Sequence, residues 1–160
     1  MNLKQLKKNF KNKKVFITGN TGFVGSYLSI TLSLMNSNLL CYSLKKNNHN
    51  YLSNFRSYKK KIKTINDDLK NISRYKKTIK EFKPEIVIHL ASQPIVKTSY
   101  ENPINTFNTN IFGTVNLLET LKDISSVKQI LIFTSDKVYK NQNNNRLNEN
   151  SSLGGIDPYS

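Results

Sequence analysis

Residues 15–25 read Val-Phe-Ile-Thr-Gly-Asn-Thr-Gly-Phe-Val-Gly, and this stretch decides the fold. Its first four residues are apolar or β-branched and stop at Gly19, which predicts a short buried strand. From residue 22 to residue 35 the apolar residues recur at helical spacing, so a helix is expected to follow directly. The stretch therefore predicts a strand, a tight glycine turn and a helix in immediate succession.

Glycine recurs at every third position of this turn, at Gly19, Gly22 and Gly25. Between a strand and a helix, such glycines allow a tight bend, a close approach of backbone to a diphosphate, and close packing of the helix on the sheet. The helix N-terminus adds N–H donors and the positive end of its dipole. We therefore predict that the turn, including Thr21 and Phe23, binds the phosphates of a dinucleotide; a purely structural glycine turn is the alternative.

The rest of the chain continues to alternate between strands and helices. The predicted strands are residues 39–44, 62–65, 85–90 and 129–134, and the predicted helices are residues 72–82 and 103–121. Residues 45–60 and the Asn-rich part after residue 134 are predicted to be loops. Strands that alternate with helices are parallel and are joined by crossovers. We therefore expect an α/β fold with a doubly wound parallel sheet, a Rossmann domain over residues 1–160.

The composition excludes several classes of protein. A chain of 160 residues is long enough for one domain with its own core. It has no run of 18 apolar residues, which excludes a membrane-spanning helix. The basic N-terminus lacks the apolar core of a signal peptide, so we expect a cytoplasmic protein. The single cysteine, Cys41, excludes a disulfide framework and a cysteine-rich zinc site, and no metal is predicted.

The net charge of +15, from 25 Lys and Arg against 10 Asp and Glu, is typical of proteins that bind nucleic acid or acidic membranes. However, lysines occur in nearly every predicted polar segment, asparagine is abundant as well, and aromatic residues do not alternate with arginines as on a stacking surface. We interpret the charge as a compositional bias. Neither a nucleic acid nor a membrane partner is expected.

Polar or small residues follow the predicted strands, at the edge where ligands of such sheets bind. Ser43 stands where a dinucleotide-binding protein often has an acid for the ribose hydroxyls, which leaves NAD and NADP both open. Asp67 or Asp68 can accept a hydrogen bond from the adenine amino group beside Leu69, and Asp68 can also cap a helix. Ala91 is small enough for the chain to lie against a flat cofactor.

The two histidines are not predicted to be catalytic. His89 lies within an apolar strand, and we interpret it as a hydrogen-bonded core residue. His49 lies in a polar segment and has no evident partner for a metal.

The predicted fifth strand is followed by Thr134, Ser135, Asp136 and Lys137, which place a hydroxyl, a carboxylate and an amine side by side. Near the end of the sequence, residues 154–160 read Gly-Gly-Ile-Asp-Pro-Tyr-Ser. An acid, a base and a phenol in one crevice suit proton transfer coupled to redox chemistry at a cofactor. The alternative, which spacing alone supports equally, is that Ser135 and Asp136 only cap a turn.

These residues resemble a known family. The Gly-x-x-Gly-x-x-Gly turn resembles that of the extended short-chain dehydrogenase/reductases. Residues 89–94 (His-Leu-Ala-Ser-Gln-Pro), 134–137 (Thr-Ser-Asp-Lys) and 153–160 (Leu-Gly-Gly-Ile-Asp-Pro-Tyr-Ser) are similar to those of the CDP-glucose 4,6-dehydratases in its NAD-dependent epimerase/dehydratase branch. The resemblance covers nearly the whole chain, and the Ser-Asp-Lys run is its most specific part.

The resemblance implies a lyase of nucleotide-sugar metabolism that uses NAD to convert CDP-glucose into a 4-keto-6-deoxy sugar. By this resemblance Tyr159 takes the proton of the sugar 4-hydroxyl, which Ser135 holds. Asp136 protonates the departing C6 hydroxyl, and Lys137 stands where related enzymes place the base for the C5 proton. Asn110 resembles an asparagine of the cofactor site that supports the tyrosine.

The same resemblance implies that the sequence is the N-terminal portion of an enzyme. The family has a lysine four positions after the tyrosine, beyond Ser160, and a sugar-binding domain after it. We therefore expect the chain to be inactive alone, and the full-length protein to be a homodimer that pairs through the helix at 103–121. Another epimerase or reductase of the superfamily, and a non-catalytic nucleotide-binding fragment, are the alternatives.

Overall fold

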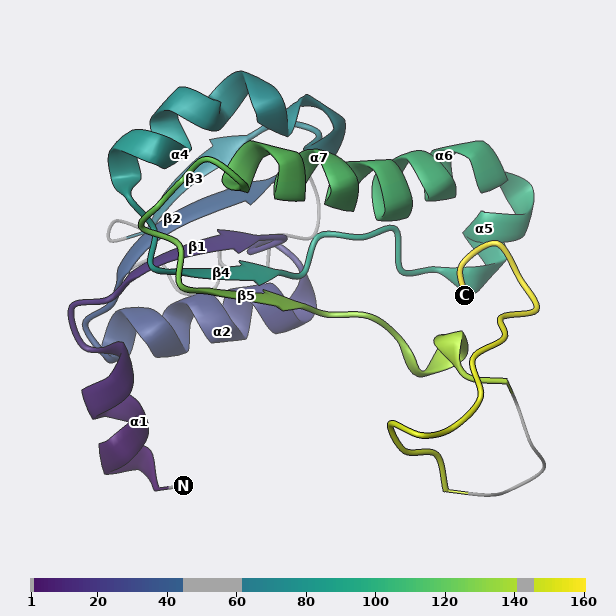
Figure 1. Cartoon of the computed structure of the whole chain (residues 1–160), viewed down its shortest axis with the longest axis horizontal. Coiled ribbons are helices and arrows are strands. Elements are labelled where there is room, and N and C mark those ends of the chain that lie inside the picture. Colours follow the sequence, from purple (N-terminus) through teal and green to yellow (C-terminus); the bar gives the residue numbers. More distant parts are fainter. Residues whose placement is uncertain (1, 45–61, 141–145) are drawn as a thin grey trace.

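The computed structural model describes residues 2–44, 62–140 and 146–160 of the chain (Figure 1). The loop predicted at 45–60 lies outside these described residues. Among the described residues, no helix combines the length and apolar character needed to cross a membrane.

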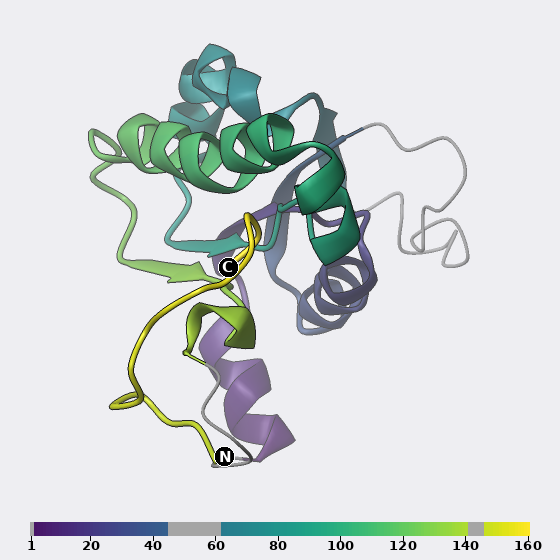
Figure 2. The ribbon, with the colours of Figure 1, turned by 90° about the vertical axis from the view of Figure 1, so that its right-hand side faces the viewer.

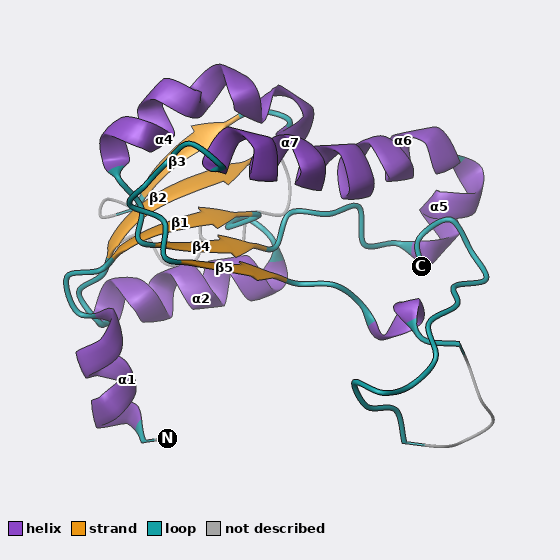
Figure 3. Ribbon diagram, viewed as in Figure 1, coloured by secondary structure: helices purple, strands orange, loops and turns teal. Residues whose placement is uncertain are grey.

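A five-stranded parallel sheet with the order β3-β2-β1-β4-β5 forms the centre of the molecule (Figure 3). Its strands are β1 (Lys14–Thr18), β2 (Asn38–Ser43), β3 (Lys63–Asn66), β4 (Ile86–His89) and β5 (Gln129–Ile132). The chain moves outward from β1 through β2 to β3, then crosses back to β4 on the other side of β1. This reversal confirms the doubly wound fold, and ligands of such sheets bind at the point of reversal.

Helices cover both faces of the sheet, as Figure 2 shows. They are α2 (Phe23–Leu34) on one face, and η2 (Leu69–Tyr75), α4 (Lys76–Phe82) and α7 (Gly113–Leu121) on the other. Because successive strand residues point to opposite faces, neighbours in sequence enter different cores. Phe16 and Tyr42 pack with the helices of the second face, whereas Ile17 and Cys41 pack against the first.

The predicted helix at 72–82 begins earlier and changes type on the way. Its first part, η2, is a 3₁₀-helix whose N-cap is Asp68, since the Asp68 side chain accepts a hydrogen bond from the Lys70 N–H. The α-helical part ends at Lys83, which has a left-handed φ of 53°, just before Pro84. The proline was therefore a correct stop signal, but the cap and not the apolar spacing sets the start.

The predicted helix at 103–121 is continuous, but its middle part is a π-helix. The segment consists of α6 (Pro103–Phe107), the π-helix η3 (Asn108–Phe112) and α7. Asn102 caps its start by accepting from the Asn105 N–H. A wider turn of this kind shifts the side chains after it and often occurs at functional sites.

The apolar pattern did not predict three short elements: α1 (Leu3–Phe10), α5 (Val96–Glu101) and η4 (Asp136–Val138). Helix α1 is capped by Asn2, whose side chain accepts from the Gln5 N–H. Part of the Asn-rich segment, residues 141–145, lies outside the described residues. The described residues after β5 are mostly loop, as predicted, but η4 interrupts them and Tyr139 forms an antiparallel bridge with Leu153. Local caps and turns create these elements, and an apolar-periodicity search does not detect them.

Candidate cofactor and substrate site

A cavity of about 600 Å³ lies beyond the carboxyl ends of β1, β2, β4 and β5. The glycine turn, the segment after β4, the π-helix and the segment after β5 line it. A second hollow of about 570 Å³ lies elsewhere, between Asn12, Asn36 and Phe82. Because no ionisable side chain lines the second hollow, the candidate site is the first.

The glycine turn has the shape of a phosphate cradle. Gly19 has a φ of 80°, and a Cβ there would lie 2.8 Å from the Ala91 nitrogen. A Cβ on Gly25 would collide with the Gly19 carbonyl oxygen. A Cβ on Gly22 would meet only that oxygen, at 3.4 Å, and Gly22 lines the cavity. Gly19 and Gly25 therefore permit the close packing of the turn, and Gly22 leaves the N-terminus of α2 open to the cavity, as an anion site requires.

The end of β2 carries a pair of hydroxyls in place of an acid. Ser43 Oγ and Thr21 Oγ1 lie 2.5 Å apart, and both residues are buried and line the cavity. The two hydroxyls tie the glycine turn to the second strand without adding negative charge. Phe23, at the start of α2, also lines the cavity.

His89 is a hydrogen-bonded core residue, as predicted. Thr18 Oγ1 accepts from the Ala91 N–H, so its own proton points to His89 Nδ1 at 2.5 Å. His89 Nε2 then carries the ring proton and donates to Thr114 Oγ1 at 3.0 Å, and Thr114 in turn donates to the Asn110 carbonyl. Burial lowers the pKa of His89 to about 4, so the ring is neutral at physiological pH.

Asn110 projects from the π-helix and fixes the segment after β4. Its Oδ1 accepts from the Gln93 N–H at 2.8 Å, and its Nδ2 donates to the Gln93 carbonyl at 3.1 Å. Asn110 and Ala91 both line the cavity. The support of Tyr159 by Asn110 stays a prediction. Sequence analysis missed Gln93, although its place directly after a strand was a usable signal.

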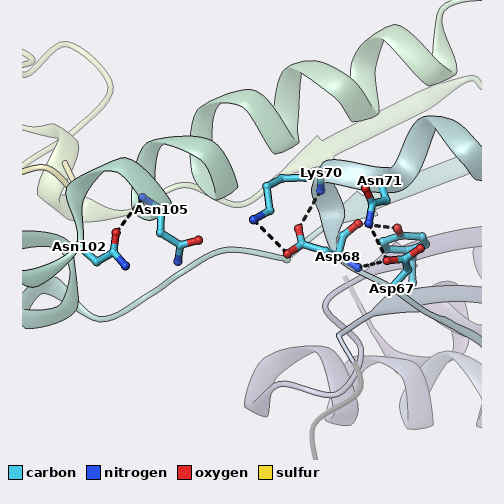
Figure 4. Close-up of polar contacts among 7 residues, drawn as sticks. Asp67, Asp68, Lys70, Asn71, Asn102 and Asn105 are labelled. Atoms are coloured by element: carbon cyan, nitrogen blue, oxygen red, sulfur yellow. Dashed lines mark hydrogen bonds and ion pairs between the residues drawn. The ribbon is translucent and has the colours of Figure 1, made fainter.

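Asp67, Asp68 and Leu69 directly follow β3 in the chain and line the cavity. Asp68 caps η2, which agrees with one of its two predicted roles. Figure 4 shows donors around the Asp67 carboxylate, whereas within the described part of the chain the Asp68 side chain has polar contacts with Lys70 alone. Of the two acids, Asp68 therefore has the more open acceptor positions for a ligand.

The cavity brings together Ser135 and Tyr159 from the ends of two distant segments. Ser135 Oγ also accepts from the Lys137 N–H and donates to Asp136, so it does cap the η4 turn. Asp136 and Lys137 are exposed and are not among the residues that line the cavity. The predicted proton-transfer roles of all four side chains stay predictions.

Apolar residues at the C-terminal side of the sheet complete the lining, and sequence analysis did not single them out. Their signal was position alone, because they end β5, follow it or lie on the π-helix. They are Ile111, Ile132, Phe133 and Val138.

The sheet order, the glycine turn after its first strand and the cavity at its point of reversal define a dinucleotide-binding α/β protein of the Rossmann class. A family model described as GDP-mannose 4,6 dehydratase matches residues 16–160, and the chain belongs to this family, within the extended short-chain dehydrogenase/reductases.

Two curated relatives illustrate the similarity. CDP-glucose 4,6-dehydratase of Salmonella typhimurium is 42% identical over 155 residues, which cover 96% of this chain and 43% of the relative. dTDP-D-glucose 4,6-dehydratase of Dictyostelium discoideum is 34% identical over 169 residues, which cover 92% of this chain and 37% of the relative. The chain thus spans less than half the length of these relatives.

Solved structures agree on the fold. UDP-glucose-4-epimerase from Stenotrophomonas maltophila, solved with bound NAD and formylated UDP-arabinopyranose, superposes with a TM-score of 0.81 at 23% identity, over 92% of this chain and 44% of that one. The epimerase of Methanothermobacter thermautotrophicus gives a TM-score of 0.83 at 23% identity, over 97% and 45% of the two chains.

Proposed function

We propose that this chain is the NAD-binding portion of a nucleotide-sugar 4,6-dehydratase that acts on CDP-glucose. The observation that carries the proposal is that the glycine turn lines the same cavity as Ser135 and Tyr159. The 42% identity to the CDP-glucose 4,6-dehydratase of Salmonella typhimurium supports this substrate over other nucleotide sugars.

The residues at the glycine end fit a dinucleotide. Gly22 leaves space where a side chain would enter the cavity, and the first N–H groups of α2 face an anion there. Ser43 and Thr21 offer hydroxyls to the adenosine ribose, and the Asp68 carboxylate accepts from the adenine amino group beside Leu69. Ala91 provides a flat wall for the nicotinamide side. We assign NAD to this site because epimerases of the same fold, from Stenotrophomonas maltophila and Brucella ovis, were solved with NAD.

The residues at the other end hold the sugar and move its protons. When bound, NAD supplies a hydride acceptor that takes hydrogen from C4 and returns it at C6. Ser135 Oγ holds the 4-hydroxyl and the Tyr159 phenolate removes its proton. Asp136 donates a proton to the departing C6 hydroxyl, which leaves as water, and Lys137 takes the C5 proton. Asp136 and Lys137 are exposed neighbours of Ser135 in η4, next to the cavity wall.

The whole enzyme requires more than these residues. Since the relatives are more than twice as long, we assign to this chain a single Rossmann domain at 1–160 and place the sugar-binding domain outside it. The full-length protein would pair as a homodimer through the helix at 103–121. An epimerase is the second candidate function, because CDP-paratose 2-epimerase of Salmonella typhi is 32% identical over 85% of this chain.

The first test is a titration of the 160-residue chain with NAD by calorimetry. We expect weak but saturable binding with one site per chain. The Gly22→Leu variant, which fills the cradle, should abolish it, and no binding by the parent chain would contradict the cofactor site.

The second test is a chimaera in which residues 1–160 replace the matching part of the Salmonella typhimurium relative. It should convert CDP-glucose into a 4-keto-6-deoxy sugar, identified by NMR. A product that keeps its C6 hydroxyl and is inverted at a ring carbon would favour the epimerase instead.

A further inference from the structure

Asp67 is the last residue before the Asp68–Leu69 pair, and its carboxylate accepts three hydrogen bonds (Figure 4). Oδ1 accepts from the Asp68 N–H at 2.7 Å and from Asn71 Nδ2 at 2.9 Å, and Oδ2 accepts from the Tyr75 hydroxyl at 2.9 Å. The Asn71 amide, the Asp68 N–H and the Tyr75 hydroxyl together hold the pKa of Asp67 below its ordinary value. The group is therefore an anion locked in one orientation by neutral donors.

Tyr42 fixes the next peptide group, between Asp68 and Leu69. Its hydroxyl donates to the Asp68 carbonyl oxygen at 2.7 Å, and that oxygen also accepts from the Asn71 N–H at 2.8 Å. The ring of Tyr42 is fully buried and meets the Tyr75 ring edge to face, with centroids 5.4 Å apart. Both backbone polar groups of Asp68 are thus held, the N–H by Asp67 and the carbonyl by Tyr42.

Asp68 itself is held less tightly through its side chain. Its Oδ1 accepts from the Lys70 N–H at 2.9 Å, and its Oδ2 lies 3.3 Å from the exposed Lys70 ammonium. A carboxylate has about four acceptor positions, so Asp68 keeps capacity for a ligand in the cavity. Three acceptor positions of Asp67 are already used by hydrogen bonds within the protein, which makes Asp67 a poor ligand and a rigid support.

We propose that Asp67 is a positioning residue for adenine recognition: with Tyr42, Tyr75 and Asn71 it fixes the two peptide groups on either side of Asp68 so that the Asp68 carboxylate faces the 6-amino group of the adenine base. The inference rests on the proposed NAD function. It goes beyond it by assigning base discrimination to a residue that need not touch the cofactor.

The test compares two cofactors, NAD and nicotinamide hypoxanthine dinucleotide, which has a 6-oxo group where NAD has the 6-amino group. The unmodified chain should bind NAD about 10- to 100-fold more tightly, the ratio that one hydrogen bond to a charged acceptor provides. Asp67→Asn removes the negative charge and leaves one acceptor oxygen where there were two, which weakens the hold on the Asp68 N–H, so the ratio should fall to within about threefold. Asp68→Asn should give the same low ratio and serves as the reference.

Two further variants separate positioning from general stability. Tyr75→Phe removes one donor but keeps the ring packing, so its ratio should fall only part of the way; it also decides the matter if Asp67→Asn does not fold. Asp123→Asn breaks a surface ion pair with Lys76 and should leave the ratio unchanged. A merely structural role for Asp67 would weaken both dinucleotides equally.

Three results would overturn the inference in distinguishable ways. An unchanged ratio in a folded Asp67→Asn protein, or in Tyr75→Phe where Asp67→Asn does not fold, removes Asp67 from recognition while the cofactor site stands. An unmodified chain that binds both dinucleotides equally removes adenine discrimination at Asp68. An unmodified chain that binds neither overturns the proposed function itself, and the inference with it.

Discussion

Single atoms decide the behaviour of the glycine turn, and two alanine substitutions should separate folding from binding. In Gly25→Ala the new methyl group meets the Gly19 carbonyl, a backbone atom that cannot move away cheaply. We expect a loss of stability of about 3 kcal/mol, measured by urea unfolding. In Gly22→Ala the φ of −74° suits alanine and the methyl group points to the cavity, so stability should be unchanged and NAD affinity should fall. Equal stability losses in both variants would contradict this reading of the turn.

The buried imidazole of His89 makes stability depend on pH. Burial lowers its pKa from 6.5 to about 4, so between these values the unfolded chain binds a proton that the folded chain does not. The free energy of unfolding should therefore fall as the pH falls through this window, by about 2 kcal/mol between pH 7 and pH 5 from this group alone. His89→Gln should remove that part of the drop. His49→Gln is the control and should keep the full pH-dependent drop in stability. If His49→Gln lost the drop and His89→Gln kept it, His89 would not be its source.

Among the elements, the π-helix is the one that organises the site. It directs Asn110 at the Gln93 peptide, and both amide atoms are used. Asn110→Ala would leave a partly buried N–H and carbonyl without these partners, at a cost of about 1–3 kcal/mol. Amide hydrogen exchange at residues 91–95 should accelerate, while exchange in β1 and β2 should not. Acceleration throughout the sheet would mean that Asn110 supports the core and not this segment.

The elements also show which features a sequence can predict. The parallel, doubly wound sheet followed from the alternation of strands and helices, and the tight turn between β1 and α2 followed from glycine spacing, because both depend on local residue type. The π-helix, the 3₁₀ start at Leu69 and the helix α1 depend on caps and on packing between distant segments. The Asn110–Gln93 contact was hidden for the same reason. Ser135 and Tyr159 were expected at one crevice and do line one cavity, whereas the placement of Asp136 and Lys137 over a substrate stays a prediction.

At the scale of the whole molecule, a broad apolar surface remains exposed. On α6, η3 and α7 the side chains of Phe107, Ile111, Val115 and Leu118 are 38–53% exposed. All four residues of β5 are exposed too. Since apolar patches of this size promote association, we expect the isolated chain to self-associate. Light scattering should show species larger than a monomer, and Ile111→Glu with Val115→Glu should reduce them. A monodisperse monomer with a cooperative thermal melt would contradict this.

Cys41 lies in the middle of the central sheet, in the core beneath α2, and it is the only thiol in the sequence. Burial raises its pKa to about 12, so in the folded chain it is both inaccessible and un-ionised. Alkylating reagents attack the thiolate, and they can reach it only when strands β1 and β2 lose their cover. The rate of labelling by iodoacetamide at pH 8 should therefore report the opening of the core at Cys41, without an engineered cysteine. Addition of NAD should slow the labelling of Cys41 as the cofactor site fills, because NAD stabilises the folded chain. The labelling rate of this one native thiol therefore reports both unfolding and cofactor binding.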